Sequence, residues 1–354
     1  MSFDAVEQVV KAVLYEGYVL YPYRASAIKN RRRWTFGGLY PPAYAEAQTG
    51  ADASSIQAEC LIIGNRPRVE IGVRFLHLFN REVGRLKSPL HDPAAGAPLD
   101  YTVVDSLEIG GQTFYTWQEA IEREVRGEFD MLGKPGGRES RLLQKTFDFP
   151  ADRETELIAD PDDDLRSVIV HKQEAIQGAI EIAAQQTGDE IFKLTVTVRN
   201  ETPLDAAAAD TRDAALERTM ASTHIVLHAT DGQFVSLTDP PDSLRPIVAD
   251  CQNVGLWPVL VGDPNRRDFM LASPIILYDF PQIAAESPGE LFDATEIDEI
   301  LTLRIQTLTD DEKRQSRDLD ERARAILDRT ASLPPEHLAK LHGAIRELRP
   351  LQNR

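Results

Sequence analysis

Strict alternation of apolar and polar side chains over residues 192–199, in the stretch DEIFKLTVTVRNETP whose last five residues predict a turn, most constrains the fold of this chain. Every second residue from Phe192 to Val198 is apolar, so an extended strand would place these side chains on one side and the polar ones on the other. A strand with one buried and one wet face is typical of antiparallel sheets. The preceding segment, EAIQGAIEIAAQQTG, carries a second strand pattern, and we expect the two to be neighbours in a sandwich.

Other segments add strands and helices to this core. Valines near helical spacing in residues 4–16 predict a short opening helix. Residues 57–83 predict two strands about the turn GNRP, and Gly110-Gly111 predicts the turn of a hairpin. The charged segment QEAIEREVRGEF, residues 118–129, is predicted to be helical, and residues 223–237, 257–262 and 269–280 contain further strand candidates.

The C-terminal part changes to helical patterns. Thr309 followed by Glu312 fits a capping box at the start of a helix, and a second helix is expected over residues 334–348. We therefore predict an α+β fold with a β-sandwich-like antiparallel core decorated by helices and with a helical C-terminus. The expected regions are 1–150 (α+β, with a Tyr/Arg-rich segment), 151–308 (β-rich) and 309–354 (helical).

Charge is distributed unevenly along the 354 residues, whose formal net charge is −18. Residues 1–90 hold 12 basic and eight acidic side chains, whereas the remainder holds 27 and 49. The acidic bulk would repel nucleic acid and anionic membranes at long range, so neither is an expected partner. The basic start is suited to an acidic partner or to the acidic part of the same chain.

Two cysteines, Cys60 and Cys251, make neither a disulfide framework nor a zinc module, and two buried thiols are the preferred interpretation. The N-terminus lacks the features of a secretory signal, and no stretch has the apolar length of a membrane span. A cytoplasmic protein is expected.

Aromatic and basic residues are concentrated in residues 16–44, EGYVLYPYRASAIKNRRRWTFGGLYPPAY. The rings could pack in the core beneath arginine stems, form a protein-binding surface rich in Tyr, Trp and Arg, or stack on single-stranded nucleic acid. The acidic remainder counts against the third alternative. The residues expected to anchor a partner are Tyr21, Tyr23, Arg24, Asn30, Arg31, Arg33 and Trp34.

An acidic segment, residues 286–299, lies near the other end of the chain. Its carboxylates lack the spacing of an EF-hand, and a solvated face is the simplest interpretation. If the segment binds, cations of a partner or of residues 24–33 fit it best. The candidate binding residues are Glu290, Asp293, Glu296, Asp298 and Glu299.

Catalytic signatures are sparse. No G-x-S-x-G elbow is present, and the glycine pairs match no phosphate-binding loop. His224 and His228 are four residues apart in a strand pattern, and two histidines on the wetter face of a sheet are preferred over a metal site. We predict no cofactor and no bound metal. The alternative is a metal-dependent enzyme whose site combines these histidines with the carboxylates of residues 293–299.

Three phrases point to a family: YEGYVLYPYRASAIKNRRRWTFGGLYP, GLWPVLVG, and MLASPIILYDFPQIAAESPGELFDATEIDEILTLRIQTLTDDEK. With them the chain resembles uncharacterised proteins encoded beside bacterial uptake [NiFe] hydrogenases and their maturation genes, over its start and residues 251–325. The resemblance implies a cytoplasmic accessory role in hydrogenase assembly or maturation, with a hydrogenase subunit or maturation factor as partner. It implies no catalytic residues. The leading hypothesis is a non-catalytic, protein-binding assembly factor.

Overall fold

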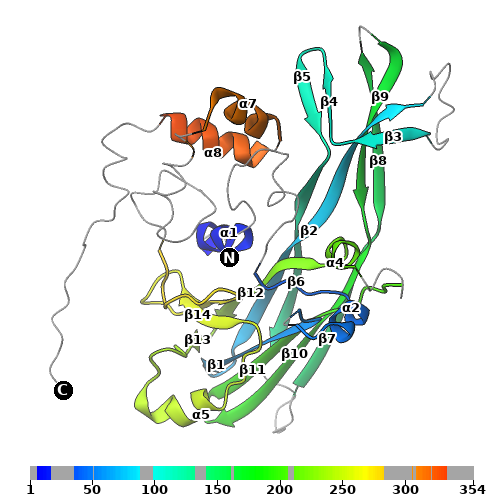
Figure 1. Ribbon diagram of the computed structural model, residues 1–354. Coiled ribbons are helices and arrows are strands. Elements are labelled where there is room, and N and C mark those ends of the chain that lie inside the picture. The colour runs from blue at the N-terminus through cyan, green and yellow to red at the C-terminus, as the bar shows by residue number, and fades with distance from the viewer. Residues whose placement is uncertain are drawn as a thin grey trace.

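The computed structural model describes residues 6–16, 36–50, 52–87, 99–131, 141–160, 163–205, 211–282, 305, 308–319 and 321–332. Antiparallel strands dominate these residues, and short helices lie around them (Figure 1). The predicted β-rich α+β class is therefore confirmed. None of the described helices is long and apolar enough to cross a membrane.

One sheet has five strands, and its centre is the alternating strand that the sequence predicts. The register pairs Val198 with Ile180 on the preceding strand, as expected for antiparallel neighbours. Along this central strand, every second residue is buried. The order is β13 (Gln233–Phe234), β1 (Ser55–Ile63), β11 (Ile191–Asn200), β10 (Ile176–Gly188) and β7 (Arg141–Phe149).

The other large sheet has eight strands built around the 19-residue strand β2 (Arg68–Leu86). One edge of β2 pairs first with β12 and then with β9, and its opposite edge pairs with β6 and then with β3. The remaining strands extend the sheet on either side. Their bounds are β3 (Tyr101–Val104), β6 (Trp117–Asp130), β8 (Asp152–Asp160), β9 (Asp163–Gln173), β12 (Met220–Thr230), β14 (Trp257–Val261) and β15 (Phe269–Ser273).

The two large sheets share one apolar core, which we call the two-sheet core. Val73 and Phe75 of β2 face Leu194 and Val196 of β11 in this core, and all four are fully buried. The expected division near residue 150 has no counterpart in the pairing, because β1 and β2 precede it and their neighbours β11 and β12 follow it.

Beyond the two-sheet core, the far half of β2 continues into an arm (Figure 1). There β2 lies between β9 and β3, and the predicted hairpin about Gly110-Gly111 is present as β4 (Ser106–Ile109) and β5 (Gln112–Tyr115). The arm has small apolar cores of its own, one around Val83 and Leu107 and the other around Leu86.

Helices lie on the periphery of the strands. Near the strands are α1 (Glu7–Tyr15), α2 (Pro42–Ala47), α4 (Arg212–Leu216) and α5 (Arg245–Ala249), the last preceded by the 3-10 turn η3 (Asp242–Leu244). The helix α7 (Asp310–Leu319) lies beside β5, and α8 (Glu321–Ser332) packs on α7. The predicted capping box is present: Thr309 Oγ1 accepts from Glu312 N, and Glu312 Oε2 accepts from Thr309 N at 2.8 Å. The helix expected at 334–348 lies outside the described residues.

One local prediction needs correction. Residues 118–129 form strand β6 rather than a helix. Trp117, Ile121, Val125 and Phe129 recur every four residues, a spacing that puts side chains on one face of a helix and on one side of a strand alike. Fourteen paired residues along β2 favour the strand. The strands flanking GNRP exist as predicted, but they are not paired with each other and belong to different sheets.

Candidate functional site

The residues proposed from sequence as partner anchors fall in ranges 17–35 and 283–304, which lie outside the described residues. The structure does describe the residues that flank these ranges. Their surroundings identify one surface, the side of the eight-stranded sheet turned away from the two-sheet core. We call it the outer face, and it carries α1 (Figure 1).

Both flanks of range 17–35 are held by neighbouring residues of β12. Ser222 Oγ donates to Val13 O near the end of α1, at 3.2 Å, and Thr223 N donates to Gly37 O at 3.0 Å. Gly37 has a φ of +60°, and an added Cβ would lie 2.5 Å from the Pro274 side chain. A glycine is therefore required where the chain returns to the sheet. The Tyr/Arg-rich range thus leaves and rejoins the fold at one place.

Just beyond the range, the described part of the aromatic segment packs inward. Tyr40 and Tyr44 are buried in one cluster with Leu76, and their rings lie 5.2 Å apart. The Arg212 guanidinium donates to Tyr40 Oη at 2.7 Å. For these two rings the core-packing interpretation is correct, whereas Phe36 remains partly exposed.

The flank of range 283–304 is fixed on β14. Asp279 Oδ1 accepts from Leu260 N at 2.8 Å, and Phe280 N donates to Leu260 O at 2.7 Å. These bonds occupy the free edge of β14, where Pro258 lacks a donor of its own. Ile275 and Leu277 pack against the α1 cluster, so the segment that precedes the acidic range lies close to the outer face.

Apolar packing holds α1 on the outer face. Valines and leucines make up much of EQVVKAVLY, and no side chain caps its N-terminus, so a nine-residue helix of this composition is marginal alone. Docking supplies the missing stability because Val10 and Val13 are almost fully buried. The sheet residues that receive the helix are Val226, Val259, Val261, Phe269 and Leu271.

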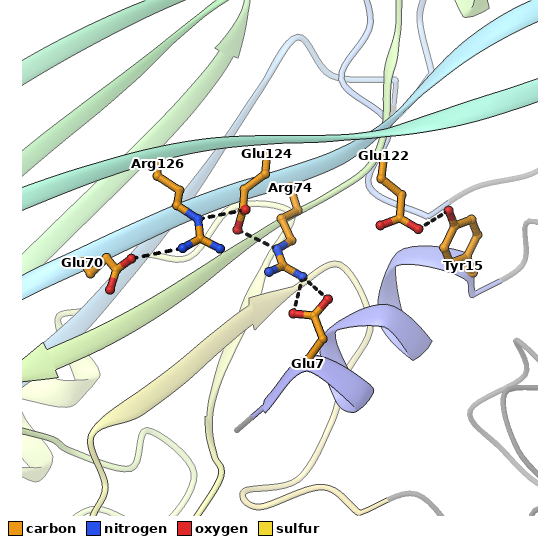
Figure 2. Close-up of polar contacts among 7 residues, drawn as sticks. All are labelled: Glu7, Tyr15, Glu70, Arg74, Glu122, Glu124 and Arg126. Atoms are coloured by element: carbon orange, nitrogen blue, oxygen red, sulfur yellow. Dashed lines mark hydrogen bonds and ion pairs between the residues drawn. The ribbon is translucent and has the colours of Figure 1, made fainter. Parts of the chain in front are cut away.

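An ion network fastens the same helix from its polar side (Figure 2). Arg74 of β2 reaches both oxygens of Glu7 at 2.9 Å, and its Nε donates to Glu124 of β6 at 2.9 Å. Arg126 donates to the second oxygen of Glu124 at 2.8 Å and lies 3.5 Å from Glu70. Only 9% of the Arg74 side chain is exposed, so its ion pairs are less screened than surface pairs.

A second polar contact lies at the C-terminal end of α1, away from the ion network that joins Glu7 at its start. Tyr15 Oη donates to Glu122 Oε1 at 2.5 Å (Figure 2). Glu122 is two residues from Glu124 on β6, so both side chains point to the outer face. Polar contacts therefore fix the two ends of α1 to two paired strands, the start to β2 through Arg74 and the end to β6 through Glu122.

Exposed apolar side chains border the outer face. Ile276 is 73% exposed and Tyr278 is 88% exposed, while the residues between and before them, Leu277 and Ile275, point inward. Trp257, at the start of β14 and opposite Ser273 of β15, is also exposed. Large exposed apolar and aromatic side chains are typical of binding surfaces. We call Trp257, Ile276 and Tyr278 the apolar rim.

The histidines of β12 do not lie on a wet surface, which corrects the prediction for His224 and His228. Their side of the strand is the outer face, but α1 and neighbouring loops cover it, and both residues are buried. His224 Nδ1 lies 3.0 Å from Ser222 O, and burial lowers the pKa of His224 to about 4. Burial also lowers the pKa of His228. Among the described residues, no three His, Cys, Asp or Glu side chains form a metal-binding group.

Both cysteines are free thiols. Burial raises the pKa of Cys60, and burial followed by the nearby Glu59 carboxylate raises the pKa of Cys251 to about 11. Nucleophilic thiol chemistry requires the thiolate, which these environments disfavour at neutral pH. Cys251 is only partly buried, in contrast to the expectation for the pair.

Sequence reasoning missed Arg74, Glu124 and the apolar rim. Arg74 and Glu124 are 50 positions apart and meet because β2 and β6 pair in register. No local pattern encodes that meeting. The alternation in 275–278 was a usable signal, since it falls in a segment predicted as strand. Comparison of the chain with family models, curated proteins and solved structures finds no match.

Proposed function

We propose that this protein is an accessory factor that binds a protein partner through the outer face of its eight-stranded sheet. The proposal is carried by one observation, which is that three features predicted or observed to suit binding lie on the same face. The flanks of the Tyr/Arg-rich range, the flank of the acidic range and the apolar rim all lie around α1 on this face. Cations, aromatic rings and exposed apolar side chains together are the composition of interface hot spots.

The partner follows from the resemblance stated above, which points to a [NiFe] hydrogenase subunit or maturation factor. An assembly role requires a surface and not a reactive group. The raised pKa values of both thiols and the burial of Cys60 and His224 support this view, because they disfavour a thiolate nucleophile and an accessible ligand. The metal-dependent alternative would need His228 and carboxylates of residues 293–299 to meet, and metal analysis of the purified protein tests it directly.

The test is recovery of a [NiFe] hydrogenase large subunit by the immobilised chain. We expect Arg31→Glu combined with Arg33→Glu to reduce recovery at least about tenfold, because two hot-spot contacts typically contribute more than 1 kcal/mol each. Ile276→Ser with Tyr278→Ser should reduce it as well. The matched control is Arg66→Glu with Arg68→Glu, which makes the same charge change in the turn between β1 and β2 and at the first residue of β2.

Equal recovery by the wild type and both test variants would remove the outer face from the interface. Loss of recovery in the control as well would indicate a general effect of charge rather than a specific surface. Circular dichroism of each variant shows whether the fold is retained.

A further inference from the structure

Three polar side chains meet where β2 leaves the two-sheet core and enters the arm. They are His77 of β2, Arg123 of β6 and Gln173, the last residue of β9. Arg123 lies opposite Phe75 and Gln173 lies opposite Phe79, so the two flank His77 from opposite edges of β2. Phe75 belongs to the two-sheet core, and opposite or alternate residues share a face, so all three polar side chains point to that side of the sheet. We call His77, Arg123 and Gln173 the junction cluster.

A direct hydrogen bond shows that the junction cluster spans the width of β2. Arg123 Nη2 donates to Gln173 Oε1 at 3.1 Å, although β6 and β9 lie on opposite edges of that strand. Phe149 of β7 lies over the cluster from the five-stranded sheet, with its ring centroid 4.7 Å from the Arg123 guanidinium and 6.4 Å from the His77 ring. His77 is fully buried, and Gln173 is buried beside it. The cluster therefore lies in the interior, between the two sheets.

Each member of the junction cluster has one buried polar atom to which no described residue is hydrogen-bonded. These atoms are His77 Nδ1, Arg123 Nε and Gln173 Nε2. Leaving one buried polar atom without a partner is costly, so native structures rarely do so. Three such atoms on neighbouring side chains of one face point to a common partner.

The hydrogen atoms of the cluster specify the chemistry of this partner. His77 Nε2 lies 2.8 Å from Glu174 O, which only accepts, so Nε2 carries the proton and Nδ1 presents a lone pair. Arg123 Nε presents an N–H donor, and so does the amide nitrogen of Gln173, whose oxygen already accepts from Arg123. The partner must therefore accept two hydrogen bonds and donate one.

This requirement excludes ions at the junction cluster. A metal ion or an ammonium would face two N–H donors. A halide or a carboxylate would suit Arg123 but would face the lone pair of His77, because burial lowers the pKa of this ring to about 4 and keeps it neutral near pH 7. Burial also lowers the pKa of Arg123, in keeping with a guanidinium removed from bulk solvent. Water supplies both lone pairs and a hydrogen without a net charge.

We propose that the junction cluster holds one internal water molecule, which accepts from Arg123 Nε and Gln173 Nε2 and donates to His77 Nδ1. Internal waters typically make about three hydrogen bonds to buried groups that lack other partners. This water joins β2 to β6 and β9 at the boundary between the two-sheet core and the arm. The proposal is independent of partner binding, because the cluster lies on the opposite side of the sheet from the outer face.

The first test is a crystal structure of the full chain, grown near neutral pH, at a resolution that shows ordered water. We expect one water oxygen within about 3.2 Å of His77 Nδ1, Arg123 Nε and Gln173 Nε2. A direct hydrogen bond between two of these atoms, an ion or another solute between them, or the absence of density there would overturn the proposal. This test needs no substitution and so does not depend on the folding of a variant.

Oxygen-17 relaxation dispersion tests the site in solution, because it counts water molecules held for longer than the tumbling time of the protein. His77→Phe combined with Gln173→Leu leaves one of the three partners, whereas a buried water needs about two to four. We expect the count to fall by one relative to wild type. The matched control is His171→Phe with Gln185→Leu, the same two changes outside the cluster, and it should leave the count unchanged. An unchanged count in the folded test variant, or an equal fall in the control, would overturn the proposal.

Discussion

Two histidines with lowered pKa values make stability depend on pH. His77 and His224 are fully buried, and burial lowers the pKa of each from about 6.5 to about 4. His77 Nε2 lies 2.8 Å from Glu174 O, a carbonyl that can only accept, so this nitrogen carries the proton of the neutral ring. Neither ring takes up a second proton in the folded chain until the solution is well below neutral.

The sign of the pH effect follows from proton binding. Between about pH 6.5 and pH 4 the unfolded chain binds protons that the folded chain does not, so stability is complete above this window and falls as the pH falls through it. The loss is up to about 3 kcal/mol for each histidine. Urea unfolding at several pH values measures it. His224→Gln should reduce the dependence of the free energy of unfolding on pH relative to wild type. If the two proteins show the same dependence, the lowered pKa of His224 is not its cause.

Arg74 is expected to be the most important single charge for docking α1. Arg74→Ala leaves Glu7 without its cation and Glu124 with Arg126 alone. We expect it to destabilise the protein by about 2 kcal/mol, less than the loss of one partner from a fully buried pair, because both acids are partly exposed. Amide exchange in α1 should rise most. Arg68→Ala is the matched control, since Arg68 is 66% exposed and its ion pair is worth about 0.5 kcal/mol or less. Similar losses of stability in Arg74→Ala and Arg68→Ala would contradict the importance of Arg74 for docking α1.

At the scale of elements, the capping box at Thr309 stabilises the start of α7 independently of the packing of that helix. Thr309→Ala removes the hydroxyl that accepts from Glu312 N and donates to the Glu312 carboxylate, at a cost of about 1 kcal/mol to the helix. Amide exchange in the first turn of α7 measures the loss. Thr309→Ser retains the hydroxyl and should behave as wild type. An unchanged first turn in Thr309→Ala would mean that packing alone holds the helix.

Local patterns predicted the elements whose period was unambiguous. The alternation of β11, the turn of the β4–β5 hairpin and the box at Thr309 are all encoded within a few neighbouring residues. The strand β6 was mistaken for a helix because its apolar residues recur every four positions, which suits both structures. Its pairing with β2 depends on residues about 50 positions away, which no local pattern reports.

The candidate site was less predictable than the elements, for a related reason. His224 and His228 were placed correctly on a strand, but whether that side of the strand is wet depends on α1, which lies about 210 residues earlier in the sequence. The meeting of Arg74 with Glu7 and Glu124 likewise requires the sheet register and the docked helix together. Composition predicted a role for the cations and rings of residues 17–35, which stays a prediction, whereas only the assembled sheet shows that the residues flanking this range lie together on β12.

At the scale of the whole molecule, β2 joins two regions with separate cores. Its first half lies in the two-sheet core, and its second half lies in the arm, where Val83 packs with Leu107 and Ile169. Because the arm core is small, the arm should open at lower free energy than the two-sheet core. Because β2 runs through both regions, we expect the folding of the arm to depend on the two-sheet core. The arm loses its central strand when the two-sheet core unfolds, whereas the two-sheet core can stay folded when the arm opens.

Two leucines of similar burial test this dependence. Leu107→Ala in the arm and Leu194→Ala in the two-sheet core each create a cavity worth about 2–5 kcal/mol. We expect Leu107→Ala to speed amide exchange in β4, β5 and the end of β2 while β10 and β11 stay protected. Leu194→Ala should speed exchange in both regions and lower the global unfolding midpoint. If Leu107→Ala instead lowers the global midpoint as much as Leu194→Ala does, β2 makes the molecule one cooperative unit, because opening of the arm then propagates along the strand into the two-sheet core.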